Sequence, residues 1–107
     1  MIKLLRLSSS IFFIFLVFFY SEIAAQDLYS AGVLEYQKKN FKAAAEAFEK
    51  FIELNPNEAT AYQYLINSYI NMQEFNKAID VIEKNKLRFR DSKEMTVLLG
   101  KLYMNSQ

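Results

Sequence analysis

The sequence of 107 residues contains no cysteine and no histidine. Without cysteine the chain cannot form a disulfide, a thiolate metal site or a cysteine nucleophile. Without histidine it lacks the usual metal ligand and the commonest general base. Only 2 glycines and 1 proline are present, which argues against a turn-rich β structure. We therefore expect no cofactor, no metal ion and no catalytic site.

An excess of charge of one sign is also missing. Lys and Arg number 13 and Asp and Glu number 12, so the formal net charge is +1 at pH 7. This balance gives no electrostatic case for a nucleic-acid partner. The chain is instead 52% hydrophobic, and Ala, Leu, Glu, Lys and Gln recur throughout. These residues favour helices, and the length allows one domain.

The first 25 residues have the order of a secretory signal peptide. Lys3 and Arg6 precede an unbroken apolar run over residues 11–20, and small residues then lead to Ala25. A basic start, an apolar centre and a small-residue end are the three regions of such a signal. We therefore predict cleavage after Ala25 and export to the bacterial periplasm or the medium.

The same segment could instead remain as a membrane anchor over residues 4–25. A transmembrane helix needs about 20 predominantly apolar residues. Residues 4–25 reach that length only by including Arg6, several serines and Glu22. The shortness of the apolar run favours cleavage, and contact with a membrane is expected only if the segment is retained.

Residues 26–107 carry a pattern that repeats every 34 residues. Three slots recur at this spacing: Gly32, Ile66 and Gly100; Ala44 and Ala78; and Phe48 and Ile82. A fixed period of this length indicates stacked supersecondary units. A helical bundle with accidental periodicity is the alternative.

Apolar residues recur within each unit at three- and four-residue spacing, which predicts helices. We place five of them, at residues 27–39, 41–54, 59–72, 75–86 and 93–105. Asp27 is expected to cap the first helix and Asn57 the third, through side-chain oxygens that accept from first-turn N–H groups. Pro56 ends the second helix because it cannot continue the hydrogen-bond ladder.

The pattern resembles the tetratricopeptide repeat, a 34-residue helical hairpin with a W-x2-L-G-x2-Y…A-x3-F…P motif. In the first unit the motif slots are filled by Leu28, Ala31, Gly32, Glu35, Ala44, Phe48 and Pro56. The resemblance implies an all-α fold of antiparallel hairpins, stacked as a short solenoid of about two and a half repeats: 26–58, 59–92 and a partial repeat over 93–107. Gly32 and Ala44 would let the helices of one hairpin approach closely, and Phe48 would fill the space towards the next hairpin.

Proteins of this family bind peptide segments of other proteins in a concave groove lined by the first helix of each hairpin. Carried over by position, the groove side comprises Tyr29, Val33, Tyr36, Gln37, Gln63, Asn67, Ile70, Asn71 and Lys101, with Val97 and Met104 beside them. The resemblance thus implies a non-catalytic module that binds a protein or peptide, and the signal-like segment before it implies that the module is exported. The alternative is a membrane-anchored scaffold or assembly factor that uses the same repeats.

Other interpretations stay open for several groove residues. Tyr29 and Tyr36 could simply pack on neighbouring turns, and Asn67 and Asn71 could be solvated surface. Some family members hold the C-terminal carboxylate of chaperones with a cationic clamp. The matching slots of this chain supply no cation, so that activity is not expected; they hold Tyr29, Val33, Glu94 and Leu98.

Three carboxylates, Glu46, Glu49 and Glu53, follow one face of the second helix. Carboxylates can perform acid–base chemistry. Placed three and four residues apart among Lys42 and Lys50, they are better explained as ion pairs on a helix surface.

The helix over residues 93–105 has no second helix to complete its hairpin. Its apolar side chains are too many for a single neighbour to cover: Leu98, Leu99, Leu102, Tyr103 and Met104. We expect either self-association through this helix, with Leu99 and Leu102 against another chain, or a chain shortened from a longer repeat protein. Sedimentation of the purified chain tests the first expectation.

Overall fold

The computed structural model describes the backbone of residues 2–105 and the side chains of residues 9–105. The side chains of Lys3 and Arg6, assigned above to a signal peptide, and Gln107 in the partial repeat lie outside that description. Within residues 2–105, five α-helices follow one another: α1 (Ile2–Gln37), α2 (Phe41–Leu54), α3 (Ala59–Asn71), α4 (Phe75–Lys84) and α5 (Lys93–Asn105).

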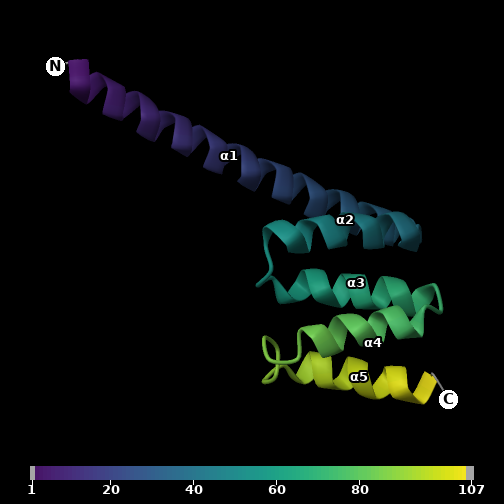
Figure 1. Ribbon diagram of the computed structural model, residues 1–107. Helices are drawn as coiled ribbons and strands as arrows, with labels where there is room; N and C mark the ends of the chain where they lie inside the picture. Colours follow the sequence, from purple (N-terminus) through teal and green to yellow (C-terminus); the bar gives the residue numbers. More distant parts are fainter. Residues whose placement is uncertain (1, 106–107) are drawn as a thin grey trace.

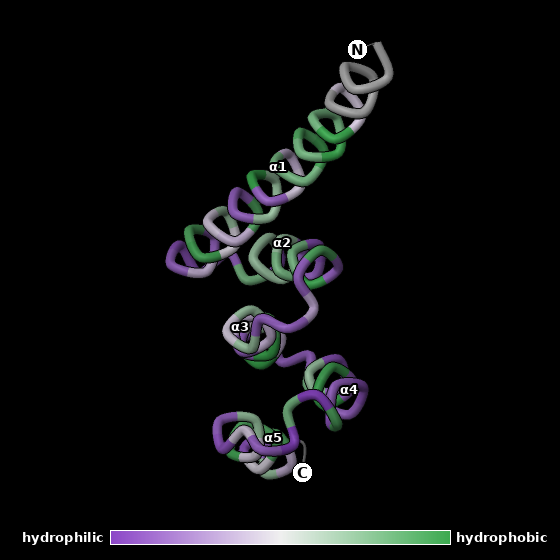
Figure 2. Tube along the Cα trace, turned by 90° about the vertical axis from the view of Figure 1, so that its left-hand side faces the viewer, coloured by the Kyte–Doolittle hydropathy of each residue, from purple (hydrophilic) through white to green (hydrophobic). Residues whose placement is uncertain are grey.

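The helices stack as antiparallel hairpins (Figure 1). Each helix packs against the next one in the sequence, and α1 also contacts α3. In Figure 2 the helices form two rows, with α3, α5 and the end of α1 in one and α2 and α4 in the other. This arrangement confirms the predicted fold, an all-α, short helical-repeat solenoid.

The predicted start of the first helix at Asp27 is wrong. α1 runs without interruption from Ile2 to Gln37, and Asp27 is an exposed residue within it and not a cap. The chain has no glycine or proline before Gly32 that would break the helix. The Ser21 hydroxyl donates to the Phe18 carbonyl at 3.1 Å inside the helix, so even this polar residue does not compete with it.

Both hairpins turn in the same way, and the two turns are one repeat apart. Among residues 2–105, Lys39 and Gln73 are the non-glycine residues with positive φ, at 64° and 60°. In the first turn the N–H of Asn40 donates to the Glu35 carbonyl at 2.9 Å and that of Lys39 to the Tyr36 carbonyl at 3.0 Å. The two corresponding bonds around Gln73 are both 2.9 Å long. This pair of hydrogen bonds is the Schellman motif that ends a helix. The 34-residue period seen in the sequence is therefore also present in the backbone.

The third helix is not capped by Asn57, as the sequence led us to expect. Glu58 is its N-cap residue, in extended conformation, and its side chain makes no capping hydrogen bond. The Glu58 carboxylate accepts instead from the Thr60 hydroxyl at 2.8 Å. The α2–α3 connection is held differently, because the Tyr62 hydroxyl donates to the Pro56 carbonyl at 2.8 Å.

The α4–α5 connection folds back onto the α2–α3 connection. α4 ends at Lys84, two residues before its predicted end. In the connection that follows, the Arg88 guanidinium donates to the Pro56 carbonyl at 2.7 Å and to the Tyr62 hydroxyl at 2.6 Å. These bonds hold the two long connections together on one edge of the domain.

The core lies between the two rows of helices. Phe48 and Ile66 are fully buried in it. The Phe48 ring stacks on Tyr64 with a centroid distance of 4.9 Å, and a Cβ added to Gly32 would lie 2.8 Å from the same ring. The expected close approach at Gly32 and the expected position of Phe48 between the hairpins are both confirmed.

The two glycines allow a matched test of this packing, because a Cβ on Gly100 would meet nothing within 4 Å. Gly32→Ala should lower the free energy of unfolding by about 1–3 kcal/mol, the usual cost of overpacking. Gly100→Ala makes the same chemical change in open space and should raise it by up to about 1 kcal/mol, because alanine favours the helix. Urea unfolding measures both, and equal shifts of the same sign would contradict the packing described.

Candidate partner-binding groove

The row of α1, α3 and α5 contains two intervals, one between α1 and α3 and one between α3 and α5. Aromatic rings pack in the first interval. Tyr64 of α3 lies edge-on against Tyr29 and Tyr36 of α1, with centroid distances of 6.2 and 5.1 Å, and stacks on Phe48. Tyr29 and Tyr36 are half-buried as a result. The packing of these two tyrosines on their neighbours, one of the interpretations left open, is therefore present; their role in binding stays a prediction.

The second interval, between α3 and α5, is open. Leu98 stands one repeat after Tyr64, and because it is smaller and has no ring it leaves a cavity of about 330 Å³. The cavity is lined by Gln63, Asn67, Lys93, Glu94, Val97 and Leu98. Two predicted groove residues, Gln63 and Asn67, are thus brought together with Val97.

The cavity places hydrogen-bonding groups opposite apolar surface. Gln63 and Asn67 stand one turn apart on α3 and are half-buried, and their side-chain amides each offer donors and an acceptor. Val97 on α5 is 56% exposed. The lining combines four polar or charged side chains with two apolar ones, so it offers a bound molecule both hydrogen bonds and an apolar contact.

The remaining predicted site residues lie outside this cavity. Val33 and Ile70 are half-buried and pack against the core. Gln37 and Lys101 are exposed on their helices. Asn71 is exposed too, and its amide donates to a main-chain carbonyl one turn earlier at 2.7 Å. Their part in binding stays a prediction.

Sequence reasoning missed Tyr64, which decides that the first interval is closed. The sequence signal for Tyr64 is its position one repeat before Leu98. Tyr64 faces α1, and Leu98 faces α3, so each side chain points to the first helix of the hairpin before its own. Lys93 and Glu94, at the start of α5, were also missed as lining residues. Both residues lie in the first turn of α5, where the sequence pattern is given by the apolar residues of the helix and not by its charged ones.

The outer face of α5 is only partly as expected. Leu102 is fully buried within this chain, so the expectation that it contacts another chain is wrong. The Leu102 side chain belongs to the core, whereas other apolar residues of α5 are exposed. These are Val97, Tyr103 and Met104, at 56%, 49% and 81% exposure. Self-association through α5 stays a prediction, and Leu102 takes no part in it.

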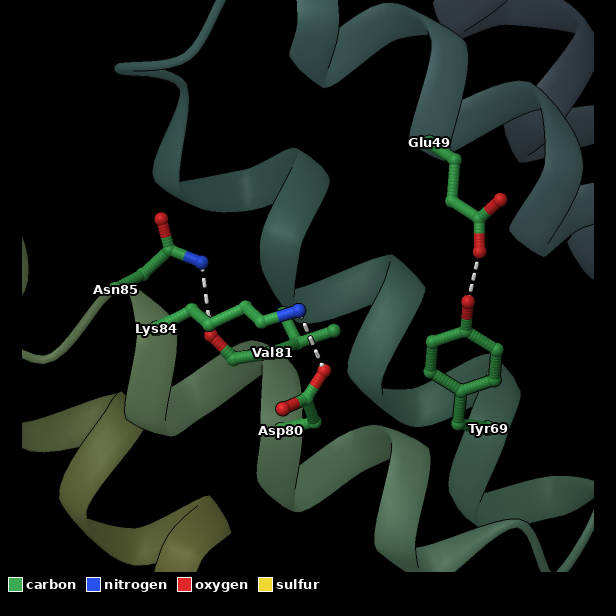
Figure 3. Close-up of polar contacts among 6 residues, drawn as sticks. All are labelled: Glu49, Tyr69, Asp80, Val81, Lys84 and Asn85. Carbon is green, nitrogen blue, oxygen red and sulfur yellow. Dashed lines mark hydrogen bonds and ion pairs between the residues drawn. The ribbon is translucent and has the colours of Figure 1, made fainter.

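Polar side chains of α2, α3 and α4 form hydrogen bonds and an ion pair (Figure 3). The Tyr69 hydroxyl donates to the Glu49 carboxylate and so joins α3 to α2. The Lys84 ammonium lies 2.9 Å from Asp80 on α4. For Glu49, the expected ion pair along its own helix is thus replaced by a bond between helices.

The part of α1 before the repeats is exposed. Residues 9–24 are all exposed, and Ala25 is the first buried residue, at 5% exposure. Within the part of the chain that the structure describes, Ser9–Gln37 is the one stretch long and apolar enough to cross a membrane. A signal sequence near the N-terminus meets the same requirement, so this helix is compatible with both a signal peptide and an anchor.

A comparison with curated proteins finds no match. A family model for the tetratricopeptide repeat matches residues 35–102, more than half of the chain. The matched stretch has the length of two units of about 34 residues and contains both Schellman turns, at Lys39 and Gln73. The chain therefore belongs to the tetratricopeptide repeat family.

Proposed function

We propose that this protein is a non-catalytic interaction module that binds a peptide segment of another protein in the cavity between α3 and α5. Tetratricopeptide repeats mediate protein–protein interactions and are typically non-catalytic. The proposal is carried by the lining of this cavity, where the half-buried amides of Gln63 and Asn67 lie beside an exposed valine.

The lining suggests how a segment would bind. An extended peptide carries backbone N–H and C=O groups along its length, and the amides of Gln63 and Asn67 can donate and accept at the same time. Val97 and Leu98 offer an apolar contact for one side chain of the peptide. Lys93 and Glu94 contribute opposite charges, so we expect the bound segment to carry little net charge.

Site-specific cross-linking tests this surface. A photo-crosslinking amino acid in place of Val97 should trap the partner in cells, and one in place of Lys50, exposed on α2, should not. The double variant Gln63→Ala/Asn67→Ala should weaken the Val97 cross-link by roughly thirtyfold, at about 1 kcal/mol for each of the two lost hydrogen bonds. Unchanged helicity by circular dichroism is the control. Equal cross-linking at Val97 and Lys50 would place the binding surface elsewhere.

We also propose that the repeats act outside the compartment in which they are made. In the first form of this proposal, cleavage after Ala25 releases an exported module into the periplasm or the medium. In the second, α1 stays intact and anchors a scaffold to the membrane. The second form is supported by the course of α1, which passes through the cleavage site as a continuous helix with Ala25 buried in the core. The first form is supported by the short apolar run over residues 11–20.

The intact mass of the protein from fractionated cells separates the two forms. The anchored form predicts an N-terminus within residues 1–3 and retention in the membrane after alkaline washing, because it keeps the buried side chain of Ala25 in the core. A soluble protein that begins at Gln26 would support the released form and contradict the anchored one. An uncleaved protein in the soluble fraction would contradict both.

A further inference from the structure

α1 leaves the repeat domain on the edge that holds the α2–α3 and α4–α5 connections (Figure 1). The α1–α2 and α3–α4 turns lie on the opposite edge. Two leucines are exposed on the first edge: Leu54 at the end of α2, at 50%, and Leu87 in the α4–α5 connection, at 85%. Two exposed leucines thus share an edge with the apolar part of α1.

The α4–α5 connection is also basic. Residues 85–92 contain one acidic residue, Asp91, and three basic ones: Lys86, Arg88 and Arg90. Since the whole chain has a formal net charge of only +1, this connection concentrates positive charge. Lys86 is 3.6 Å from Glu83, but both side chains are exposed, and such surface pairs are weak. Leu54 lies in a different setting, between the acidic Glu53 and Glu58.

We propose that the α4–α5 connection binds the surface of an anionic bilayer, with Leu87 in the headgroup region and Lys86 and Arg90 at the level of the lipid phosphates. The proposal rests on the anchored form of the function proposed above and adds a second membrane contact to it. Burial of an apolar side chain together with attraction of basic residues to anionic lipid is how interfacial segments bind.

Two features make a bilayer the occupant of this edge. Ala25 already belongs to the core, so no flexible linker separates the apolar part of α1 from the repeats. The hydrogen bonds of Arg88 to Pro56 and Tyr62 hold the connection on the edge from which α1 leaves. An anchored α1 therefore brings Leu87 towards the membrane surface.

This orientation has a consequence for the cavity between α3 and α5. Lys93, the first residue of α5, is part of its lining and directly follows the basic connection. One end of the cavity would therefore lie close to the lipid surface, so that the partner segment is held next to the membrane.

Single-cysteine labelling tests the contact, since the natural chain has no cysteine. The full-length protein is reconstituted in vesicles of phosphatidylcholine and phosphatidylglycerol with an environment-sensitive fluorophore on Leu87→Cys. The matched control is Gln73→Cys, in the turn on the opposite edge. We expect the Leu87→Cys label to emit at shorter wavelength and to be quenched by nitroxide lipids, and the Gln73→Cys label to show neither change. Adding Lys86→Glu and Arg90→Glu should lower the ratio of bound to free connection by roughly tenfold or more.

A label on Phe15→Cys, in the apolar part of α1, separates this proposal from the anchoring on which it rests. Quenching of the Phe15→Cys label together with a water-exposed Leu87→Cys label would overturn the proposal and leave the anchor standing. Absence of quenching at both positions would overturn the two together. A Leu87→Cys label that changes only when a protein partner is added would show a protein contact, which also overturns the proposal.

Discussion

The contact of Phe48 with Gly32 and Tyr64 is the one on which the rest of the domain depends. The Phe48 ring is fully buried, lies where α1 has no side chain, and stacks on Tyr64 of the next hairpin. One side chain therefore joins both helices of the first hairpin to the second hairpin. Because Tyr64 also meets Tyr29 and Tyr36, the same contact closes the interval between α1 and α3.

The open second interval follows from a difference in side-chain size at equivalent positions. Tyr64 and Leu98 occupy the same slot of successive repeats, but a leucine cannot fill the space that a tyrosine fills, and Gln63 and Asn67 stand where the first repeat has Tyr29 and Val33. A repeat solenoid thus keeps one backbone plan and changes its surface through single residues. The repeat period fixes where side chains lie but not which residue occupies each position. The candidate groove can therefore combine polar and apolar side chains.

The fold could be predicted from the sequence because its determinants are local or strictly periodic. The positions of Gly32 and Phe48 recur 34 residues later, at Ile66 and Ile82. The helix ends at Lys39 and Gln73 are the same distance apart. The continuity of α1 could not be predicted, since the signal-like order of residues describes what a peptidase recognises and says nothing of helix ends. Of the predicted binding residues that we carried over from the repeat motif, Gln63 and Asn67 line the cavity. The motif positions do not show that Tyr64 packs against Tyr36 and closes the space between α1 and α3.

Equilibrium unfolding of Phe48→Ala in urea tests the central contact most directly. The account predicts a loss of about 3–5 kcal/mol in the free energy of unfolding, because a large buried ring is removed from the meeting point of three helices. Phe75→Ala, at the half-buried first residue of α4, is the matched control and should cost clearly less. A loss below about 1 kcal/mol for Phe48→Ala, with helicity unchanged, would contradict the account, since core aromatic-to-alanine changes cost several times more.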